Sequence, residues 1–271
     1  MPEPPSRFVT SSDGTPIAVF SSGHGPPLIL VHGAAADHTT FRVAGPLFDE
    51  RFRVHAIDRR GRGASGDGPG YDVRREFEDI AAVAAAISVE AGRPADVVGH
   101  SFGGRVTLGA ALGSPPAIRR AVVYEGAPPA PRAPYQEREL PSRLRALLAE
   151  RGPEALLEVF LGEVVGLAPD ELAAYRANPV WPARVAAAAT IVRELEAEIS
   201  DAAGLEALGR VEIPVLQVLG GASRAPFRIA TEALDARLRD GRVVTIEGAK
   251  HAAHHTHAGR FVSEVETFLA G

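Results

Sequence analysis

The chain has 271 residues, no cysteine and a formal net charge of −5 at pH 7. That length suits one large domain or two small ones. Without cysteine the protein has no disulfide, no thiolate nucleophile and no Cys-ligated metal centre. A sequence pI near 6.0 argues against nucleic-acid binding, which needs a cationic surface.

The beginning of the chain carries no pattern typical of a targeting signal. Residues 1–12 are polar and proline-rich, without the apolar segment of a secretory signal. The longest apolar stretches, such as 81–87 and 185–192, are much too short to span a membrane. We therefore expect a cytoplasmic protein that has no membrane partner.

The first part of the chain alternates between strand and helix patterns. Continuous apolar runs predict buried strands, helical periodicity predicts helices, and Asp13-Gly14 predicts a hairpin turn between the first two strands. The predicted strands are Arg7–Ser11, Thr15–Ser21, Leu28–Val31, Phe52–Ile57, Asp96–Val98 and Ile118–Tyr124, and the predicted helices are Asp72–Ala91 and Phe102–Leu112. This order implies an α/β fold with a parallel sheet and right-handed crossovers.

The pattern changes between Ala127 and Arg210, where only helical and loop signals occur. The helices predicted there are Ala146–Val165, Pro169–Ala177 and Ala183–Ile199. Alternation then resumes with a strand at Val215–Leu219, a helix at Phe227–Leu238, a strand at Arg242–Ile246 and a helix at Gly259–Leu269. We expect an α/β core of residues 1–126 and 211–271 and a helical insertion at 127–210, since a structureless loop of about 80 residues is improbable.

The sequence Gly-His-Ser-Phe-Gly at residues 99–103 matches the pattern G-x-S-x-G. A predicted buried strand leads into it and a predicted helix follows, which is the context in which this pattern marks a nucleophile. The glycines allow a very sharp strand-to-helix turn. Ser101 is therefore predicted to project at the carboxyl edge of the sheet, where ligands bind in open α/β sheets.

Four segments together resemble the α/β-hydrolase superfamily along nearly the whole chain. They are His32-Gly33 after an early strand, the loop 58–65, the turn at Ser101, and residues 248–251 near the end. The resemblance implies an α/β-hydrolase fold, with a mostly parallel sheet, flanking helices and residues 127–210 as a helical cap over the active site. It also implies a catalytic serine, acid and histidine in that chain order. No cofactor and no metal ion is expected.

The resemblance places the catalytic imidazole at His251, after the last predicted strand. Most family members carry the acid after the strand at 215–219, but Ser223 occupies that slot and cannot carry the charge. Other members carry it after the preceding strand, where Glu125 stands. A carboxylate at the end of an apolar strand is costly without partners, so Glu125 is the predicted acid. The fallback acids are Asp201, Asp235 and Asp240.

Two backbone N–H groups are expected to hold the negative oxygen of the reaction intermediate. The amide of Phe102 follows the predicted nucleophile and begins a helix, whose N-terminus favours negative charge. The second amide is expected from Ala34, in the loop of small residues after Gly33.

Further side chains are predicted near the substrate. His32 is expected to hydrogen-bond at the base of its loop, His100 to pack beside the nucleophile and Trp181 to line an apolar pocket under the cap, and all three are candidate substrate-binding residues. The histidines at 254, 255 and 257 are interpreted as surface or pocket residues. A metal site in this cluster is the alternative, but no carboxylate lies beside it at ligand spacing.

The arginine-rich loop at residues 58–65 raises the question of phosphate binding. It lacks the lysine and the spacing of a P-loop. Its counterpart in the family is a structural loop, so its arginines are interpreted as packing and ion-pairing residues.

These features predict a serine hydrolase that cleaves a small or medium carboxylic ester, lactone or thioester through an acyl-enzyme. One alternative keeps the same three residues but performs C–C hydrolysis, perhydrolysis or a cofactor-free lyase or cyclase step. A second is a non-catalytic ligand-binding protein, and a third is an interaction module that uses the cap. We expect a small-molecule substrate, no nucleic-acid partner, and a monomer or homodimer.

Overall fold

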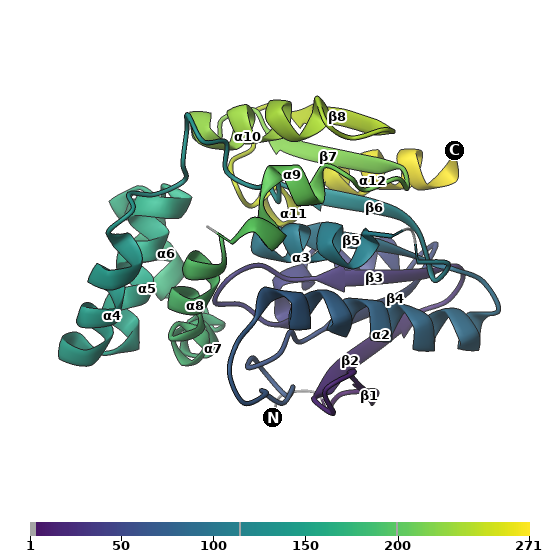
Figure 1. The fold of residues 1–271 in the computed structure, drawn as a ribbon, viewed down its shortest axis with the longest axis horizontal. Helices are drawn as coiled ribbons and strands as arrows, with labels where there is room; N and C mark the ends of the chain where they lie inside the picture. The colour runs from purple at the N-terminus through teal and green to yellow at the C-terminus, as the bar shows by residue number, and fades with distance from the viewer. Residues whose placement is uncertain (1–3, 114, 199) are drawn as a thin grey trace.

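The computed structural model describes residues 4–113, 115–198 and 200–271. Eight strands form one sheet in the order β1-β2-β4-β3-β5-β6-β7-β8 (Figure 1). β2 pairs antiparallel with both β1 and β4, and all other neighbours are parallel. The strands are β1 Arg7–Thr10, β2 Pro16–Gly23, β3 Pro27–Val31, β4 Arg53–Ile57, β5 Ala95–His100, β6 Ile118–Tyr124, β7 Val215–Gly220 and β8 Gly241–Ile246.

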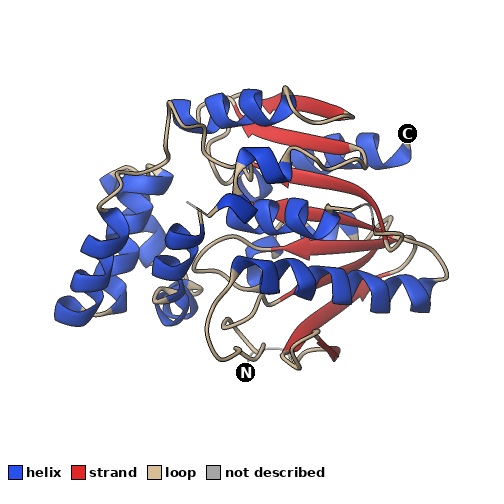
Figure 2. Cartoon of the chain, viewed as in Figure 1, coloured by secondary structure: helices blue, strands red, loops and turns tan. Residues whose placement is uncertain are grey.

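The central strands are buried on both faces because helices cover both sides of the sheet, as Figure 2 shows. All five residues of β3 are buried. Leu28 and Leu30 belong to one core cluster, while Ile29 and Val31 belong to the other. The alternation follows from the two-residue period of a strand and explains why the sequence of β3 is continuously apolar.

The covering helices pack apolar side chains against the sheet, and α3 is buried on all sides. Phe48 of α1 and Phe261 of α12 belong to the core cluster of Leu28, whereas Phe77 of α2 and Val106 of α3 belong to the opposite one. The helices of the core are α1 Gly45–Phe48, α2 Val73–Ala91, α3 Phe102–Ala111, α10 Ala225–Asp235, α11 Ala253–Thr256 and α12 Ala258–Ala270, with a short 3-10 helix η1 at His38–Phe41.

The described residues between β6 and β7 form helices and loops and no strand, apart from an isolated bridge between Ala130 and Ala133. Its helices α4 to α8 lie beyond the carboxyl ends of the parallel strands (Figures 1 and 2). They are α4 Leu140–Arg151, α5 Pro153–Phe160, the π-helix η2 Leu161–Val165, α6 Pro169–Arg176, α7 Trp181–Ala187, α8 Thr190–Ala197, the 3-10 helix η3 Asp201–Ala203 and α9 Leu205–Leu208.

Two predicted helices of this insertion are wrong as single elements. The one at Ala146–Val165 is broken at Gly152, whose φ of 83° ends α4, and Pro153 begins α5. The one at Ala183–Ile199 is two helices, and its last residue lies outside the described residues. Between them, Ala188 N–H donates to the carbonyl of Val185, which is the tighter turn of a helix end.

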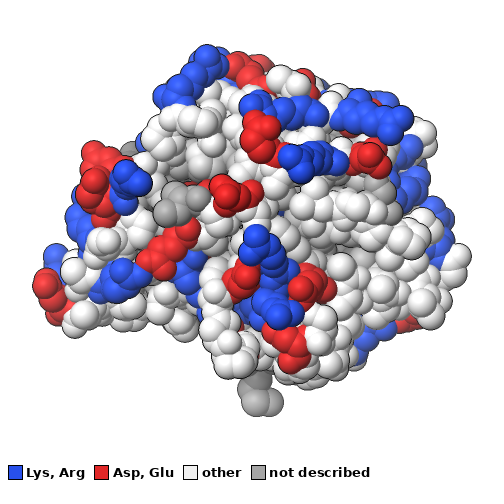
Figure 3. Space-filling model, viewed as in Figure 1, with Lys and Arg blue, Asp and Glu red and all other residues white. Residues whose placement is uncertain are grey.

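No helix among the described residues is long and apolar enough to cross a membrane. On the face shown in Figure 3, basic and acidic side chains are interspersed among uncharged ones. This mixture accords with a net charge of only −5.

Candidate active site

The turn at Ser101 has the sharp geometry that its sequence predicts. β5 ends at His100 and α3 begins at Phe102, which leaves Ser101 alone between them with φ of 53° and ψ of −128°. A Cβ atom at Gly99 would lie 2.5 Å from the carbonyl oxygen of Gly103. Gly99 therefore cannot be replaced without opening the turn, and this close approach accounts for the first glycine of the pattern.

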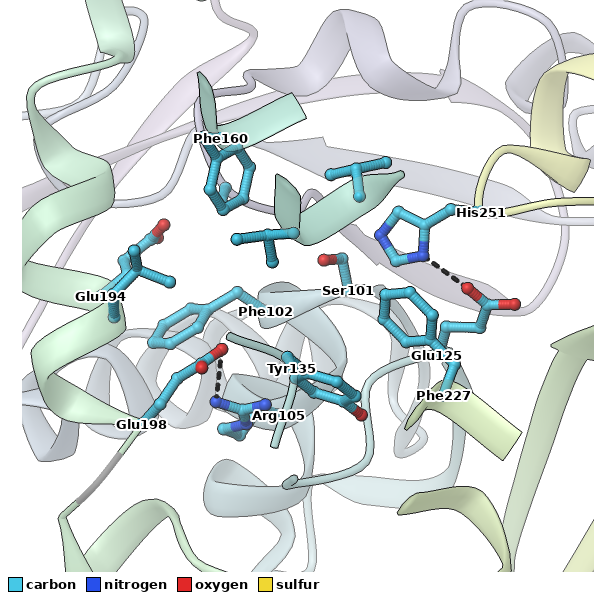
Figure 4. A pocket seen from close by; sticks show the side chains of 14 residues that line it. Ser101, Phe102, Arg105, Glu125, Tyr135, Phe160, Glu194, Glu198, Phe227 and His251 are labelled. Atoms are coloured by element: carbon cyan, nitrogen blue, oxygen red, sulfur yellow. Dashed lines mark hydrogen bonds and ion pairs between the residues drawn. The ribbon is translucent and has the colours of Figure 1, made fainter. Parts of the chain in front are cut away.

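His251 and Glu125 form a buried pair beside this turn (Figure 4). His251 Nδ1 donates to Glu125 Oε2 at 2.5 Å, while Glu125 Oε1 accepts from the backbone N–H of Gly220 at 2.8 Å. The ring of Phe227 stacks on the imidazole with centroids 4.7 Å apart. The carboxylate thus fixes the orientation of the ring and leaves Nε2 as the nitrogen that can accept a proton.

Positive φ marks three residues of this region. Ala35, Ser101 and Glu125 have φ of 46°, 53° and 46°, and no other non-glycine residue in the described ranges has positive φ. Such conformations are costly and persist only where the surrounding structure enforces them. They fall on the loop after β3, on the predicted nucleophile and on the predicted acid, so the strain is concentrated where three chain segments meet.

The loop after β3 lies directly against Ser101. A Cβ atom at Gly33 would be only 2.9 Å from the Cβ of Ser101, and Ala34 lines the same cavity as Ser101 and Phe102. The predicted oxyanion-hole residues Ala34 and Phe102 therefore line one cavity with the serine.

A small enclosed cavity joins these groups under the helical insertion (Figure 4). Its volume is about 20 Å³, which is room for about one water molecule. The lining residues come from the core and from the insertion: Ala34, Ser101, Phe102, Arg105, Glu125, Tyr135, Phe160, Val164, Val165, Glu194, Leu195, Glu198, Phe227 and His251. Most of this wall is apolar. Its other charged side chains, Arg105, Glu194 and Glu198, lie away from the His251–Glu125 pair (Figure 4).

The pattern of an alpha/beta hydrolase family model matches residues 28–265. The chain belongs to the alpha/beta hydrolase family.

Solved structures and curated proteins that resemble this hydrolase cover nearly its whole length. An alpha/beta hydrolase from Sphaerobacter thermophilus is 36% identical with a TM-score of 0.80, covering 95% of this chain and 99% of its own. An esterase from Rhodococcus sp. is 26% identical with a TM-score of 0.77, covering 98% of both chains. A pimeloyl-[acyl-carrier protein] methyl ester esterase of Neisseria meningitidis is 29% identical, covering 89% of this chain and 92% of its own. Ester hydrolysis is thus the activity supported at the level of the family.

The acid of the pair in this hydrolase follows β6. Glu125 is the carboxylate that pairs with His251 in the described part of the chain, and it is 3% exposed. Ser223 stands after β7, and its buried hydroxyl has no hydrogen-bond partner among the described residues. The fallback acid Asp235 lies instead near the Nε2 of Gln217, at 3.5 Å.

The three candidate substrate-binding residues are not among the residues that line the cavity of the hydrolase. His32 Nε2 accepts from the backbone N–H of Arg59 at 3.0 Å, and its Nδ1 donates to the carbonyl of Gly33. His100 Nε2 donates to the carbonyl of His251 at 2.8 Å. Trp181 Nε1 donates to Glu154 at 2.9 Å, which holds the indole inside the insertion. Each of the three side chains makes a structural hydrogen bond, and the second ring nitrogen of His100, Nδ1, is buried without a partner among the described residues.

The other histidines beside His251 form a packed cluster. The ring of His254 lies 4.3 Å from that of His100 and 5.7 Å from that of Phe41. Burial lowers the pKa of both His100 and His254 well below the usual value, so both remain neutral packing residues at pH 7. The described residues contain no group of three or more His, Asp or Glu side chains arranged to hold a metal ion.

The arginines of the loop 58–65 are buried in ion pairs, as predicted. Arg59 Nε is 2.7 Å from Glu76, and its Nη2 is 2.5 Å from Glu194 of the insertion. Arg62 pairs with the same two glutamates. Arg60 pairs with Asp79 at 2.6 Å, so the loop is locked to α2 and to α8.

Sequence reasoning missed the charged part of the cavity wall. Arg105 lies only four residues after Ser101 and lines the same cavity, and this short separation could have been noticed in the sequence. Its ion-pair partner Glu198 follows α8, and no sequence signal connects two residues so far apart.

Proposed function

We propose that this alpha/beta hydrolase is a serine esterase that cleaves small or medium carboxylic esters, lactones or thioesters through an acyl-enzyme. The observation that carries the proposal is the hydrogen-bonded pair of His251 and Glu125 in one enclosed cavity with Ser101. The esterases among its relatives support the type of bond.

In the proposed mechanism, Ser101 Oγ attacks the carbonyl carbon of the substrate and His251 Nε2 accepts the hydroxyl proton. A serine hydroxyl is a poor nucleophile until a base takes that proton. Glu125 accepts the Nδ1 proton throughout, which keeps the ring in the productive tautomer and stabilises the imidazolium. The imidazolium then protonates the leaving alcohol or thiol. In the second half of the reaction, water attacks the acyl-enzyme and gives a proton to His251, which then protonates Ser101 Oγ as the acid is released.

The negative oxygen of each tetrahedral intermediate is proposed to lie between the N–H groups of Phe102 and Ala34. Phe102 is the first residue of α3, so the helix N-terminus adds a favourable potential. Gly33 lets the loop of Ala34 approach the serine closely. Loss of one such donor typically costs about 3–4 kcal/mol of transition-state stabilisation.

The cavity as it stands is too small for a substrate, since it has room for about one water molecule. Substrate entry therefore requires the insertion, or the side chains that it contributes, to move outward. The insertion would then close over the bound ester and exclude bulk water. Apolar side chains such as Phe160 and Leu195 favour an acyl group that is largely hydrocarbon.

A panel of p-nitrophenyl esters, aliphatic lactones and thioesters tests the proposal, with Ser101→Ala as the control. We expect measurable hydrolysis of one or more of these classes and a loss of kcat of at least about 10⁴-fold in the variant. A folded wild-type protein with no activity on any class, or undiminished activity in Ser101→Ala, would contradict it.

A further inference from the structure

A polar region lies in the wall of the cavity away from the His251–Glu125 pair (Figure 4). Arg105 is its centre. It is buried on α3, four residues after Ser101, and its backbone N–H donates to the carbonyl of Ser101 at 3.4 Å. The polar region therefore begins one helical turn from the predicted nucleophile.

The insertion supplies the partner of this arginine. Arg105 Nη1 lies 2.9 Å from Glu198 Oε1, and Arg105 Nη2 donates to the carbonyl of Ala127 at 3.3 Å. The guanidinium carbon lies 5.4 Å from the ring centroid of Phe102 and 6.0 Å from that of Tyr135. Two aromatic rings and a carboxylate thus hold the guanidinium in one position.

Three buried polar atoms of this wall have no hydrogen-bond partner among the described residues. The donor Arg105 Nη1 lies beside Glu198 as an ion pair, which leaves the donor Arg105 Nε and the acceptor Glu194 Oε2. Buried donors and acceptors in proteins are nearly always paired. Two unpaired atoms of opposite kind on one cavity wall point to a ligand that offers both an acceptor and a donor.

The charge of the wall indicates what kind of group it accepts. Arg59 and Arg62 offset Glu76 and Glu194, and Arg105 offsets Glu198. A substrate carboxylate would add an unbalanced negative charge close to two glutamates in a buried site. An ammonium group would add an unbalanced positive charge close to Arg105. An uncharged group avoids both penalties.

We propose that Arg105 and Glu194, with Glu198 holding Arg105 in place, select substrates whose acyl chain carries an uncharged hydrogen-bonding group, an amide or a hydroxyl, a few bonds from the reacting carbonyl. The oxygen of this amide or hydroxyl group accepts from Arg105 Nε, and its N–H or O–H donates to Glu194 Oε2. This inference rests on the proposed esterase function and assigns the acyl group to that side of the cavity.

The test compares p-nitrophenyl esters of three acids of equal chain length, ending in a carboxamide, a carboxylate and an isopropyl group. The three ends have nearly the same shape and differ in charge and hydrogen bonding. We expect kcat/KM for the amide ester to exceed that for each of the other two by about 10- to 100-fold, the range for hydrogen bonds to charged groups. The p-nitrophenyl ester whose acyl chain ends in the isopropyl group, called the isopropyl ester below, reports the proposed esterase function separately.

A double variant, Arg105→Met with Glu198→Leu, removes the guanidinium without leaving an unpaired buried charge. The ratio of kcat/KM between the amide and isopropyl esters is expected to fall to about one, whatever the absolute rates. Glu196→Gln, on α8 but outside the cavity wall, is the matched control and should keep the wild-type ratio.

Equal kcat/KM for the amide and isopropyl esters in the wild-type protein would overturn the inference and leave the esterase function standing. A preference for the carboxylate ester would also overturn it. Hydrolysis of none of the three would overturn the inference, and the wider panel of esters, lactones and thioesters would then decide the proposed function. Because these outcomes come from the wild-type protein, they decide the question even if the double variant does not fold.

Discussion

Glu125 supplies a carboxylate to His251 from the end of β6, while the position after β7 is occupied by the uncharged Ser223. It stands at the end of β6 with φ of 46°, and both of its carboxylate oxygens are occupied, one by His251 and one by the N–H of Gly220. A buried carboxylate held by two donors has a fixed position. The strained backbone therefore serves to aim the carboxylate at the imidazole.

The first prediction compares the two positions proposed for the acid. Glu125→Gln is expected to lower the acylation rate strongly, up to about 10⁴-fold, because an amide N–H₂ facing Nδ1 would favour the wrong tautomer of His251. Ser223→Ala should change the rate by less than about threefold, since its hydroxyl has no partner in the described chain. Pre-steady-state release of p-nitrophenol measures both rates.

The reverse ranking of these two variants would refute the role of Glu125. Circular dichroism of each variant serves as the control for folding.

At the scale of these residues, the sequence singles out Ser101, His251 and Glu125 because each follows a strand whose apolar run is easy to recognise, and the three line one cavity in the structure. The candidate substrate-binding residues, by contrast, do not line this cavity. His32 and Trp181 are polar or aromatic residues in plausible places, yet both are taken up by structural hydrogen bonds. Only the packed structure shows which polar groups remain for a ligand.

At the scale of elements, buried ion pairs fasten the helical insertion to the core. Arg184 of α7 lies 2.7 Å from Asp37, in the loop after β3, and Glu194 of α8 pairs with both Arg59 and Arg62. Breaking a buried pair by removing one partner typically costs about 3–5 kcal/mol, far more than an exposed pair. These contacts position the insertion over Ser101.

The second prediction concerns two glutamates of the same helix. Glu194→Gln is expected to lower the free energy of unfolding by about 3–5 kcal/mol, because Arg59 and Arg62 would then share one buried carboxylate. Glu196, whose partner Arg145 is exposed, is the matched control, and Glu196→Gln should cost about 0–1 kcal/mol. Urea unfolding measures both, and equal losses would contradict the role of the buried pair.

Helix boundaries within the insertion were the least predictable feature of the fold. The break at Gly152-Pro153 is visible in the sequence in hindsight, whereas the turn at Ala188 interrupts a run of alanines that favour helix. In the core, alternation of buried strands with helices left few choices, and the predicted order matches the structure apart from the short helices η1, α1 and α11, which were not predicted.

At the scale of the whole molecule, several histidines are buried in neutral form. Burial, with the charges of Arg7 and Arg53, lowers the pKa of His55 to about 4. Burial also lowers the pKa values of His32, His100 and His254. In the unfolded chain these groups bind protons below about pH 6.5.

The third prediction follows from the sign of these shifts. Between about pH 6.5 and pH 4 the unfolded chain binds more protons than the folded one, so the free energy of unfolding falls as the pH falls and is flat just above that range. His55 alone accounts for about 2 kcal/mol between pH 6.5 and pH 5. Urea unfolding at pH 7 and pH 5 measures the loss.

His55→Gln is expected to show a correspondingly smaller loss over the same pH range. His24→Gln, at an exposed position, should keep the pH dependence of the wild type. An unchanged pH dependence in His55→Gln would contradict the account of this buried histidine.

The central claim is that Ser101 is the nucleophile, and a fluorophosphonate probe tests it most directly. The probe bonds to serine hydroxyls that a neighbouring base activates. We predict one adduct per chain, mapped to Ser101 by peptide mass spectrometry, and no adduct in a folded Ser101→Ala variant. A folded wild-type protein that stays unlabelled, or that is labelled at another residue, would contradict the claim.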